Sequence, residues 1–132
     1  IKAGTINASR AYDLENQVPN HSTVLTFTYT TDMFDALVRF NRYGDWDTTG
    51  GLFGPPDASD ATSYDGATLV DIEATVRLND TFTIAVGGEN VFDELPDDEV
   101  NGTLRYLGVE DAVTSPWGFN GAFWYVRAKA QF

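Results

Sequence analysis

The sequence predicts an all-β fold in which five or six strands form an antiparallel meander. Val, Ile, Thr, Phe and Tyr recur in runs with a period of two, which is typical of strands with two different faces. Short polar turns alternate with long loops rich in Gly, Pro and Asp. Helix patterns are almost absent, and no apolar run reaches the length of about 18 residues that a transmembrane helix requires.

Five segments carry the strand pattern, and in chain order they are 22–30, 36–46, 67–78, 81–90 and 120–132. The first, STVLTFTYT, is rich in β-branched and aromatic residues, and the second, ALVRFNRYGDW, alternates apolar and charged positions. The third, ATLVDIEATVRL, and the fourth, TFTIAVGGEN, also alternate, and the fifth, NGAFWYVRAKAQF, alternates up to a final aromatic. Residues 1–12 are expected to hold the end of a sixth strand. Only the acidic run DELPDDEV could form a short turn, and Pro96 interrupts it.

The connections between these segments are of two kinds. Residues 30–35 and 79–80 form short polar turns, whereas 47–66 and 91–119 are long. Loops longer than about 12–15 residues are uncommon in compact domains and usually carry function. A soluble sandwich can show this alternation by chance, but barrels of the outer membrane have short turns on one side and long loops on the other.

Each strand has one face without charge, apart from Arg42 near a strand end. The third segment shows this most clearly, because its even positions are apolar and its odd positions include Asp71, Glu73 and Arg77. The apolar face of the last segment consists of Trp124, Val126, Ala128, Ala130 and Phe132. In a soluble β-sandwich such a face points inward, whereas in a transmembrane barrel it meets lipid. Alternation alone leaves both interpretations open.

The positions of the aromatic residues favour the transmembrane barrel. One group lies beside the short turns or the terminus: Phe27, Tyr29, Phe34, Phe82 and Phe132. A second group lies beside the long loops: Tyr43, Trp46, Phe92, Phe123, Trp124 and Tyr125. Two aromatic belts around an aliphatic band are typical of a barrel wall at the two membrane interfaces. The alternative is that Phe and Tyr simply favour strands.

Parity fixes the expected register of the hairpin around Asn79. Directly paired residues face the same side, so a three-residue loop places Leu78 opposite Phe82 and Val76 opposite Ile84. The same register places Asp71 opposite Glu89, which is unfavourable for like charges. We therefore expect a compensating charge cluster on the polar, lumen-facing side, made of Asp71, Glu73, Glu89, Arg127 and Lys129.

Composition excludes several classes of function. The formal charge of −12 argues against a nucleic-acid partner, because phosphate contacts need Lys and Arg. The chain has no cysteine and one histidine, His21, and we find no nucleophile paired with a base, so we expect neither an enzyme nor a cofactor. Carboxylates suited to calcium occur at Asp93, Glu94, Asp97, Asp98 and Glu99. Their spacing does not match an EF-hand, so we expect a solvated acidic loop and no metal site.

The run TFTIAVGGENVFDELPD resembles the late-strand motif of TonB-dependent outer-membrane receptors, with Gly87, Asn90, Phe92 and Asp93 at the positions of the phrase GxxNxFD. VPNHSTVLTFTY, YGDW, LVDIEATVRL and SPWGFNGAFWYVRAKAQF follow the order usual in that family. The resemblance extends from about Val18 onward. It implies that residues 1–132 are the C-terminal part of a large transmembrane β-barrel, without the plug domain. We expect Asn90 and Asp93 to cap the loop entry by side-chain to backbone hydrogen bonds.

The resemblance also implies a function and a set of partners. Family members import scarce nutrients such as ferric siderophores, haem, cobalamin or oligosaccharides across the bacterial outer membrane, energised by TonB. The expected partners are outer-membrane lipid, the plug and other strands of a barrel of about 22 strands, TonB through the plug, the nutrient, and the barrel-assembly machinery. That machinery would read the terminal signal Trp124, Val126, Ala128, Ala130 and Phe132.

Residues of the two long loops are expected to contact the substrate. They are Trp46, Phe53, Tyr64, Arg105, Tyr106, Trp117 and Phe119. The alternative role for these aromatics is to pack the loops against one another or to anchor them at the interface. A competing class of protein is a soluble β-sandwich that binds carbohydrate or another ligand, and a passive porin fits the late-strand phrases less well.

Overall fold

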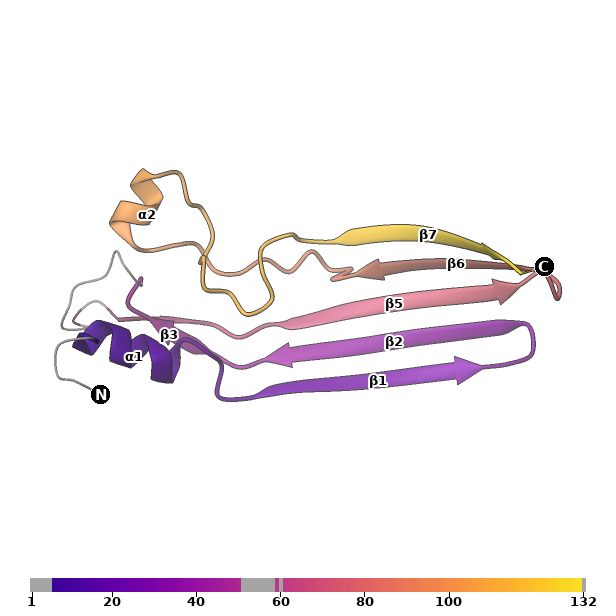
Figure 1. The fold of residues 1–132 in the computed structure, drawn as a ribbon, viewed down its shortest axis with the longest axis horizontal. Coiled ribbons are helices and arrows are strands. Elements are labelled where there is room, and N and C mark those ends of the chain that lie inside the picture. The colour runs from indigo at the N-terminus through magenta and orange to yellow at the C-terminus, as the bar shows by residue number, and fades with distance from the viewer. Residues whose placement is uncertain (1–5, 51–58, 60, 132) are drawn as a thin grey trace. The chain divides into compact units, whose positions relative to one another are not determined.

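The computed structural model describes residues 6–50, 59 and 61–131. Its elements in chain order are α1 (Ala8–Asn16), β1 (Ser22–Thr30), β2 (Phe34–Tyr43), β3 (Trp46–Thr48), β4 (Thr62–Tyr64), β5 (Thr68–Arg77), β6 (Phe82–Glu89), α2 (Gly102–Tyr106) and β7 (Phe123–Ala130) (Figure 1). The chain divides into two compact units. The sheet unit comprises Thr23–Arg42, Thr68–Glu94 and Asn120–Phe132, and the loop unit comprises Ile1–Ser22, Tyr43–Ala67 and Leu95–Phe119.

The sheet unit is an antiparallel meander of five strands in the order β1-β2-β5-β6-β7 (Figure 1). Each of these strands lies at one of the five predicted segments, so the predicted fold class is confirmed. The second predicted segment is divided, because β2 ends at Tyr43 and Trp46 begins the separate strand β3. β3 pairs with β4 in a small second sheet that belongs to the loop unit.

The register of the β5–β6 hairpin follows the predicted parity. Val76 pairs with Ile84, and Leu78 N donates to Phe82 O over 2.9 Å, which closes the three-residue loop. The side chain of Asn79 shapes that loop, because its Oδ1 accepts hydrogen bonds from the backbone N–H groups of Thr81 and Phe82, each over 2.9 Å. An Asn at this position therefore favours the turn by a local hydrogen-bonding mechanism.

The loop unit contains the two helices, and α1 corrects one expectation. Residues 1–12 do not form a strand in their described part, because α1 begins at Ala8. Asn7 caps this helix by accepting a hydrogen bond from Arg10 N over 2.8 Å, and the segment ASRAYDLEN is rich in good helix formers. Asn101 caps α2 in the same way, accepting from Thr103 N and Leu104 N. Within the described chain, neither helix has the length and apolar character needed to span a membrane.

The hydrophobic core of the loop unit is built around Trp46 of β3 and Tyr64 of β4. Trp46 and Tyr64 pair across this ribbon and stack at 5.4 Å, and Trp117 packs edge-on against Trp46 at 5.1 Å. Ala112 is fully buried in the same cluster, and Trp46 Nε1 donates to Thr114 Oγ1 over 3.0 Å. The long loops therefore fold onto a compact aromatic core.

Candidate functional site

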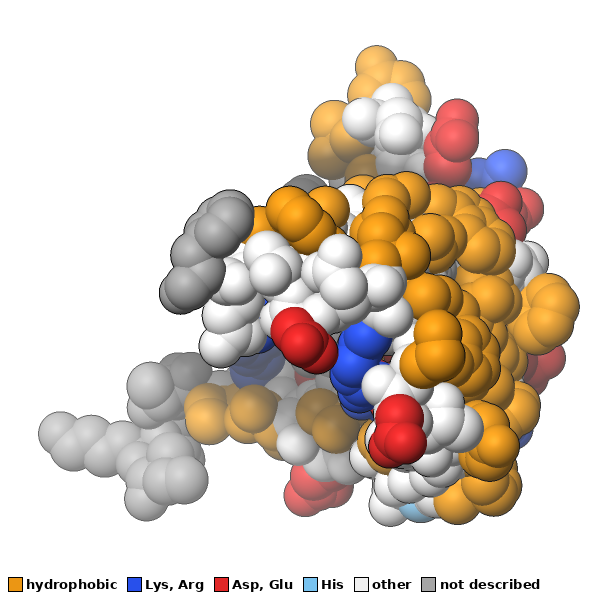
Figure 2. All heavy atoms as spheres, turned by 90° about the vertical axis from the view of Figure 1, so that its right-hand side faces the viewer, with side chains coloured by type: hydrophobic (Ala, Val, Ile, Leu, Met, Phe, Trp, Pro, Cys, Tyr) orange, Lys and Arg blue, Asp and Glu red, His pale blue; other side chains and the backbone are white. Residues whose placement is uncertain are grey.

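Apart from the pair Arg42 and Thr68 near the ends of β2 and β5, the even positions of β2, β5, β6 and β7 form one continuous apolar face. Register brings Val38 opposite Ile72, Val76 opposite Ile84, and Val86 opposite Val126. Phe27 on β1 extends this face, because its ring contacts the ring of Phe40 at 6.3 Å. Figure 2 shows the hydrophobic side chains gathered in a band along one side of the sheet.

This apolar face is accessible to its surroundings. Val126 is 73% exposed, and Phe27 and Trp124 are 58% and 57% exposed. A contiguous apolar surface of this kind is rare on a soluble monomer and marks contact with a membrane or a protein partner. The face is therefore the first candidate functional surface of the chain.

The opposite, polar face of the sheet carries an ordered cluster around Glu73. Tyr125 donates its hydroxyl to Glu73 Oε2 over 2.5 Å, and Arg127 forms an ion pair with the same oxygen at 2.6 Å. Thr75 Oγ1 donates to Glu73 Oε1 over 3.3 Å. The guanidinium of Arg127 also lies 5.6 Å from the centre of the Tyr125 ring. Side chains from β5 and β7 thus meet across the intervening strand β6.

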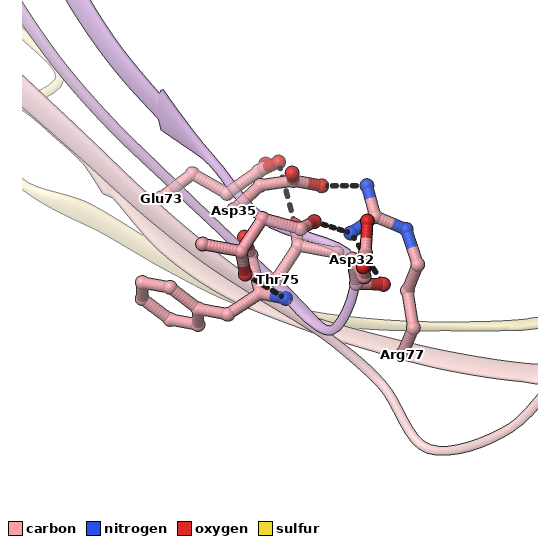
Figure 3. A network of polar contacts seen from close by, with 7 residues as sticks. Asp32, Asp35, Glu73, Thr75 and Arg77 are labelled. Carbon is pink, nitrogen blue, oxygen red and sulfur yellow. Dashed lines mark hydrogen bonds and ion pairs between the residues drawn. The ribbon is translucent and has the colours of Figure 1, made fainter.

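A second polar contact ties β5 to the turn between β1 and β2. Arg77 forms an ion pair with Asp35, and its Nη1 donates to the carbonyl oxygen of Thr31 over 3.0 Å. Figure 3 shows Arg77 directed toward Asp35 and the turn at Asp32, with Thr75 and Glu73 beside them. Two ion pairs, Arg77–Asp35 and Arg127–Glu73, thus lie on this face of the sheet.

The structure brings together only part of the predicted charge cluster. Glu73 and Arg127 are paired, but among the described residues neither Glu89 nor Lys129 forms an ion pair. Asp71 receives hydrogen bonds from Asn41 Nδ2 over 2.8 Å and from the backbone N–H of Asn90 over 3.0 Å. Amide groups, rather than the expected Arg or Lys, therefore satisfy this carboxylate. That the cluster lines a lumen stays a prediction.

Asn90 and Asp93 cap the start of the last long loop, which confirms the sequence expectation. Both residues have positive φ angles, 48° and 59°. The side chain of Asn90 donates to Glu94 O over 2.9 Å and accepts from Glu94 N over 3.0 Å, and Asp93 Oδ1 accepts from Ala122 N over 2.8 Å. Asn and Asp tolerate this backbone conformation better than other residues with a side chain.

Three of the predicted substrate-contacting residues belong to the core of the loop unit. Trp46 and Tyr64 are 2% and 3% exposed, and Trp117 is partly buried against them. Their rings pack against one another, which is the packing role that the sequence left open. Tyr64 also donates its hydroxyl to buried Glu99 over 3.0 Å. Burial and this hydrogen bond raise the pKa of Tyr64 to about 12.

The remaining predicted loop residues are more open. Tyr106 is 90% exposed at the end of α2, Phe119 is 57% exposed, and Arg105 lies beside Asp98 and Glu110 around a surface hollow of about 350 Å³. Phe53 and Phe132 lie outside the described residues. Contact of any of these residues with a substrate stays a prediction.

Sequence analysis missed a polar lock between α1 and the segment after β3. The carboxylate of Asp13, 2% exposed, accepts hydrogen bonds from the Thr49 N–H over 2.8 Å and from the Thr49 hydroxyl over 2.9 Å. Ser9 Oγ lies 2.5 Å from the same hydroxyl. Nearby, Tyr12 donates to Asp47 over 3.0 Å, and this hydrogen bond, together with burial, raises the pKa of Tyr12. The Asn7 cap was the available signal for α1, but nothing in the sequence indicated that Asp13 of this helix contacts Thr49.

The acidic segment that follows Asp93 makes local polar contacts. Asp97 Oδ2 accepts from the backbone N–H of Asp65 over 2.8 Å, and Glu99 Oε1 accepts from Asn101 N over 2.8 Å. Within the described part of the chain, no group of three or more His, Cys, Asp or Glu residues is placed to hold a metal ion.

Comparison with known proteins gives one informative result. No protein-family model matches the chain, and no curated protein matches it. Among solved structures, the chain is similar to a mutant of the ferric enterobactin receptor from Pseudomonas aeruginosa, with a TM-score of 0.59 and 17% sequence identity. The match covers 87% of this chain. The likeness shows the fold, which is that of a segment of a large β-barrel. The chain spans only 16% of the length of that receptor.

Proposed function

We propose that the chain is part of a TonB-dependent active-transport receptor in the bacterial outer membrane, contributing barrel wall and external loops. The exposed apolar face of the sheet carries this proposal, because a five-stranded sheet with that face in water would be unfavourable. In hydrocarbon the same face needs no protein cover, and the charged and polar side chains of the opposite face suit a polar lumen. The proposed role is transport without catalytic chemistry.

The proposed cargo is a ferric siderophore, in preference to haem, cobalamin or an oligosaccharide. Two observations support it together: the late-strand phrases resemble TonB-dependent receptors, and the fold resembles part of a ferric enterobactin receptor. Exposed Arg105, Tyr106 and Phe119 are proposed as ligand contacts. Trp46, Tyr64 and Trp117 would hold the loops in shape around that ligand.

The proposed partners follow from the same role. Outer-membrane lipid would cover the apolar face, and the plug and the remaining strands of the receptor would complete the barrel. TonB would act through the plug. The barrel-assembly machinery would read β7, where Trp124, Val126, Ala128 and Ala130 share the apolar face.

The test places the same charge on either face of one strand at the same depth. Ala74 lies mid-strand on the apolar face of β5, and its neighbour Thr75 lies on the polar face. Ala74→Arg in the full-length protein should reduce the amount of assembled receptor in the outer membrane, because an arginine at the bilayer midplane costs about 2–4 kcal/mol. Thr75→Arg, near Glu73 and Asp35, should assemble normally and retain TonB-dependent ferric siderophore uptake.

The readouts are heat-modifiable mobility of the barrel on gels and uptake of labelled ferric siderophore. Equal assembly of both variants would contradict the lipid-facing assignment. A protein that is monomeric and folded in water without detergent would instead support the soluble sandwich. Assembly with the expected asymmetry but without siderophore uptake would leave the barrel wall intact and refute the cargo.

A further inference from the structure

The register of β7 on β6 is weakly specified by most of its apolar side chains. Ile84 pairs with Ala128, Phe82 with Ala130 and Val86 with Val126. A slip by one residue would reverse the faces of the strand and is therefore costly. A slip by two residues leaves each side chain on its own face of the sheet and only gives most of the apolar residues a different apolar partner. Something else must select the observed register against the two-residue slip.

Gly87 provides a notch for an aromatic ring on the polar face. It pairs with Tyr125 on one side and with Glu73 on the other, so the three residues form one row across β7, β6 and β5. A Cβ atom at Gly87 would lie 2.5 Å from Cζ and from the hydroxyl of Tyr125. The tyrosine ring thus crosses β6 directly over the missing side chain. This path lets its hydroxyl reach Glu73 at 2.5 Å.

Gly88 provides a second notch on the apolar face. It pairs with Trp124, and a Cβ atom there would lie 2.8 Å from Cε3 and 3.0 Å from Cδ2 of the indole. Two consecutive glycines on β6 therefore receive two consecutive aromatic rings of β7, one on each face. Packing of an aromatic over a strand glycine is a known means of fixing pairing.

We propose that Gly87–Gly88 and Trp124–Tyr125 form a register lock that selects the pairing of β7. A slip by two residues in one direction would place Tyr125 against Ala85 and Trp124 against Val86. A slip in the other direction would place Tyr125 against Glu89 and Trp124 against Asn90. In both, each ring meets a side chain instead of a notch, and Tyr125 leaves the row of Glu73. The lock requires neither ligand nor TonB, and it accounts for the glycine pair independently of transport.

The test moves the notches without changing the composition. In the permuted protein, the order Ala-Val-Gly-Gly at residues 85–88 becomes Gly-Gly-Ala-Val by Ala85→Gly, Val86→Gly, Gly87→Ala and Gly88→Val. The lock then predicts a register shift of two residues, because Tyr125 fits only opposite residue 85. The experiment uses the full-length protein assembled in membranes.

Pairs of engineered cysteines report the register. The chain has no cysteine of its own. Thr83→Cys with Lys129→Cys reports the observed register, because these residues pair directly. Thr81→Cys with Lys129→Cys reports the shifted register, and Thr83→Cys with Gln131→Cys reports the opposite slip. All these positions have the parity of the polar face, and none belongs to the Glu73 cluster.

The observed sequence should give mainly the disulfide between residues 83 and 129, and the permuted sequence mainly that between 81 and 129. A permuted protein that still forms mainly the 83–129 product overturns the lock. If the permuted protein forms no disulfide product, a second variant tests the register lock. Trp124→Ala and Tyr125→Ala are then combined in the protein that keeps the original residues 85–88, with the same cysteine pairs. A mixture of registers there supports the lock, whereas a single 83–129 product, or none, overturns it. These disulfides form whether or not the receptor transports a siderophore, so this result and the uptake result are separate.

Discussion

Replacing Asp13 by alanine tests whether its hydrogen bonds to Thr49 hold α1 in place within the loop unit. Asp13 is the only carboxylate that the described contacts place on Thr49, accepting from both its N–H and its hydroxyl. Thr49 is 1% exposed, so water does not readily replace the lost acceptor. The substitution therefore leaves a backbone N–H without a partner inside the unit.

The expected loss can be estimated from these contacts. A hydrogen bond to a charged group contributes about 1.5–3 kcal/mol, and an unpaired buried donor costs about 1–3 kcal/mol. The two effects overlap, because both describe the same N–H, so we expect a local loss of about 3 kcal/mol. Such a loss raises the equilibrium constant for local opening by roughly 100-fold.

Hydrogen exchange of backbone amides in β3 and α1 measures this opening directly. Asp13→Ala should accelerate exchange at Thr49 and in α1 while leaving β5 and β6 protected. Glu15→Ala is the matched control, since it removes an exposed carboxylate from the same helix and should change exchange little. Asp13→Asn retains one acceptor oxygen and should give an intermediate rate. Unchanged exchange at Thr49 in Asp13→Ala would refute the role of the Asp13–Thr49 hydrogen bonds in holding α1.

Two further predictions concern Tyr64 and Asn90. Because the pKa of Tyr64 is about 12 in the folded state against 10.0 as its ordinary value, its contribution to the stability of the loop unit is complete below pH 10 and decreases as the pH rises toward 12. In Tyr64→Phe, the stability of the loop unit should depend less on pH in this range, as measured by unfolding followed through tryptophan fluorescence. An unchanged pH profile would refute the assignment of this dependence to Tyr64. At Asn90, with φ of 48°, Asn90→Ala should destabilise more than Asn90→Gly by about 1–2 kcal/mol in urea unfolding, because only glycine accepts this conformation freely. Equal stability of the two variants would contradict this.

The sheet was predictable because its strands carry a local signal. Alternation in LVDIEATVRL and TFTIAV assigns each side chain to a face, and parity then permits the hairpin register through Asn79 without distant information. Asn90 and Asp93 were predictable for a similar reason. Both have a turn conformation that Asn and Asp favour, and Asn90 bonds Glu94 only four residues along the chain, although the Asp93 bond to Ala122 spans 29 residues.

The loop unit was not predictable because its order depends on distant partners. Asp13 and Thr49 lie 36 residues apart, and Tyr64 and Glu99 lie 35 residues apart. Neither pair has a periodic signal. The short helix α1 has a cap at Asn7, but its nine residues show only moderate amphipathic character, so the local pattern alone did not outweigh the strand expectation.

The same limit applied to the aromatic residues of the loops. Tryptophan and tyrosine suit a buried core and a ligand surface equally well, because both roles use large rings with one polar atom. Exposure separates the roles: Trp46 and Tyr64 are buried in the core, whereas Tyr106 is almost fully exposed. A sequence without structure offers no measure of that difference.

The distribution of buried apolar residues gives an independent argument for the environment of the sheet. Five of the seven buried hydrophobic residues among the described positions, namely Trp46, Tyr64, Ala67, Leu104 and Ala112, belong to the loop unit. The sheet unit contributes only Val70 and Ala85, although it contains more Val, Ile and Phe residues than the loop unit. Hydrogen bonds alone do not stabilise an open sheet in water, because unfolded strands form them with the solvent. This distribution supports the proposal that the apolar face of the sheet is covered from outside the chain, as lipid would cover a barrel wall.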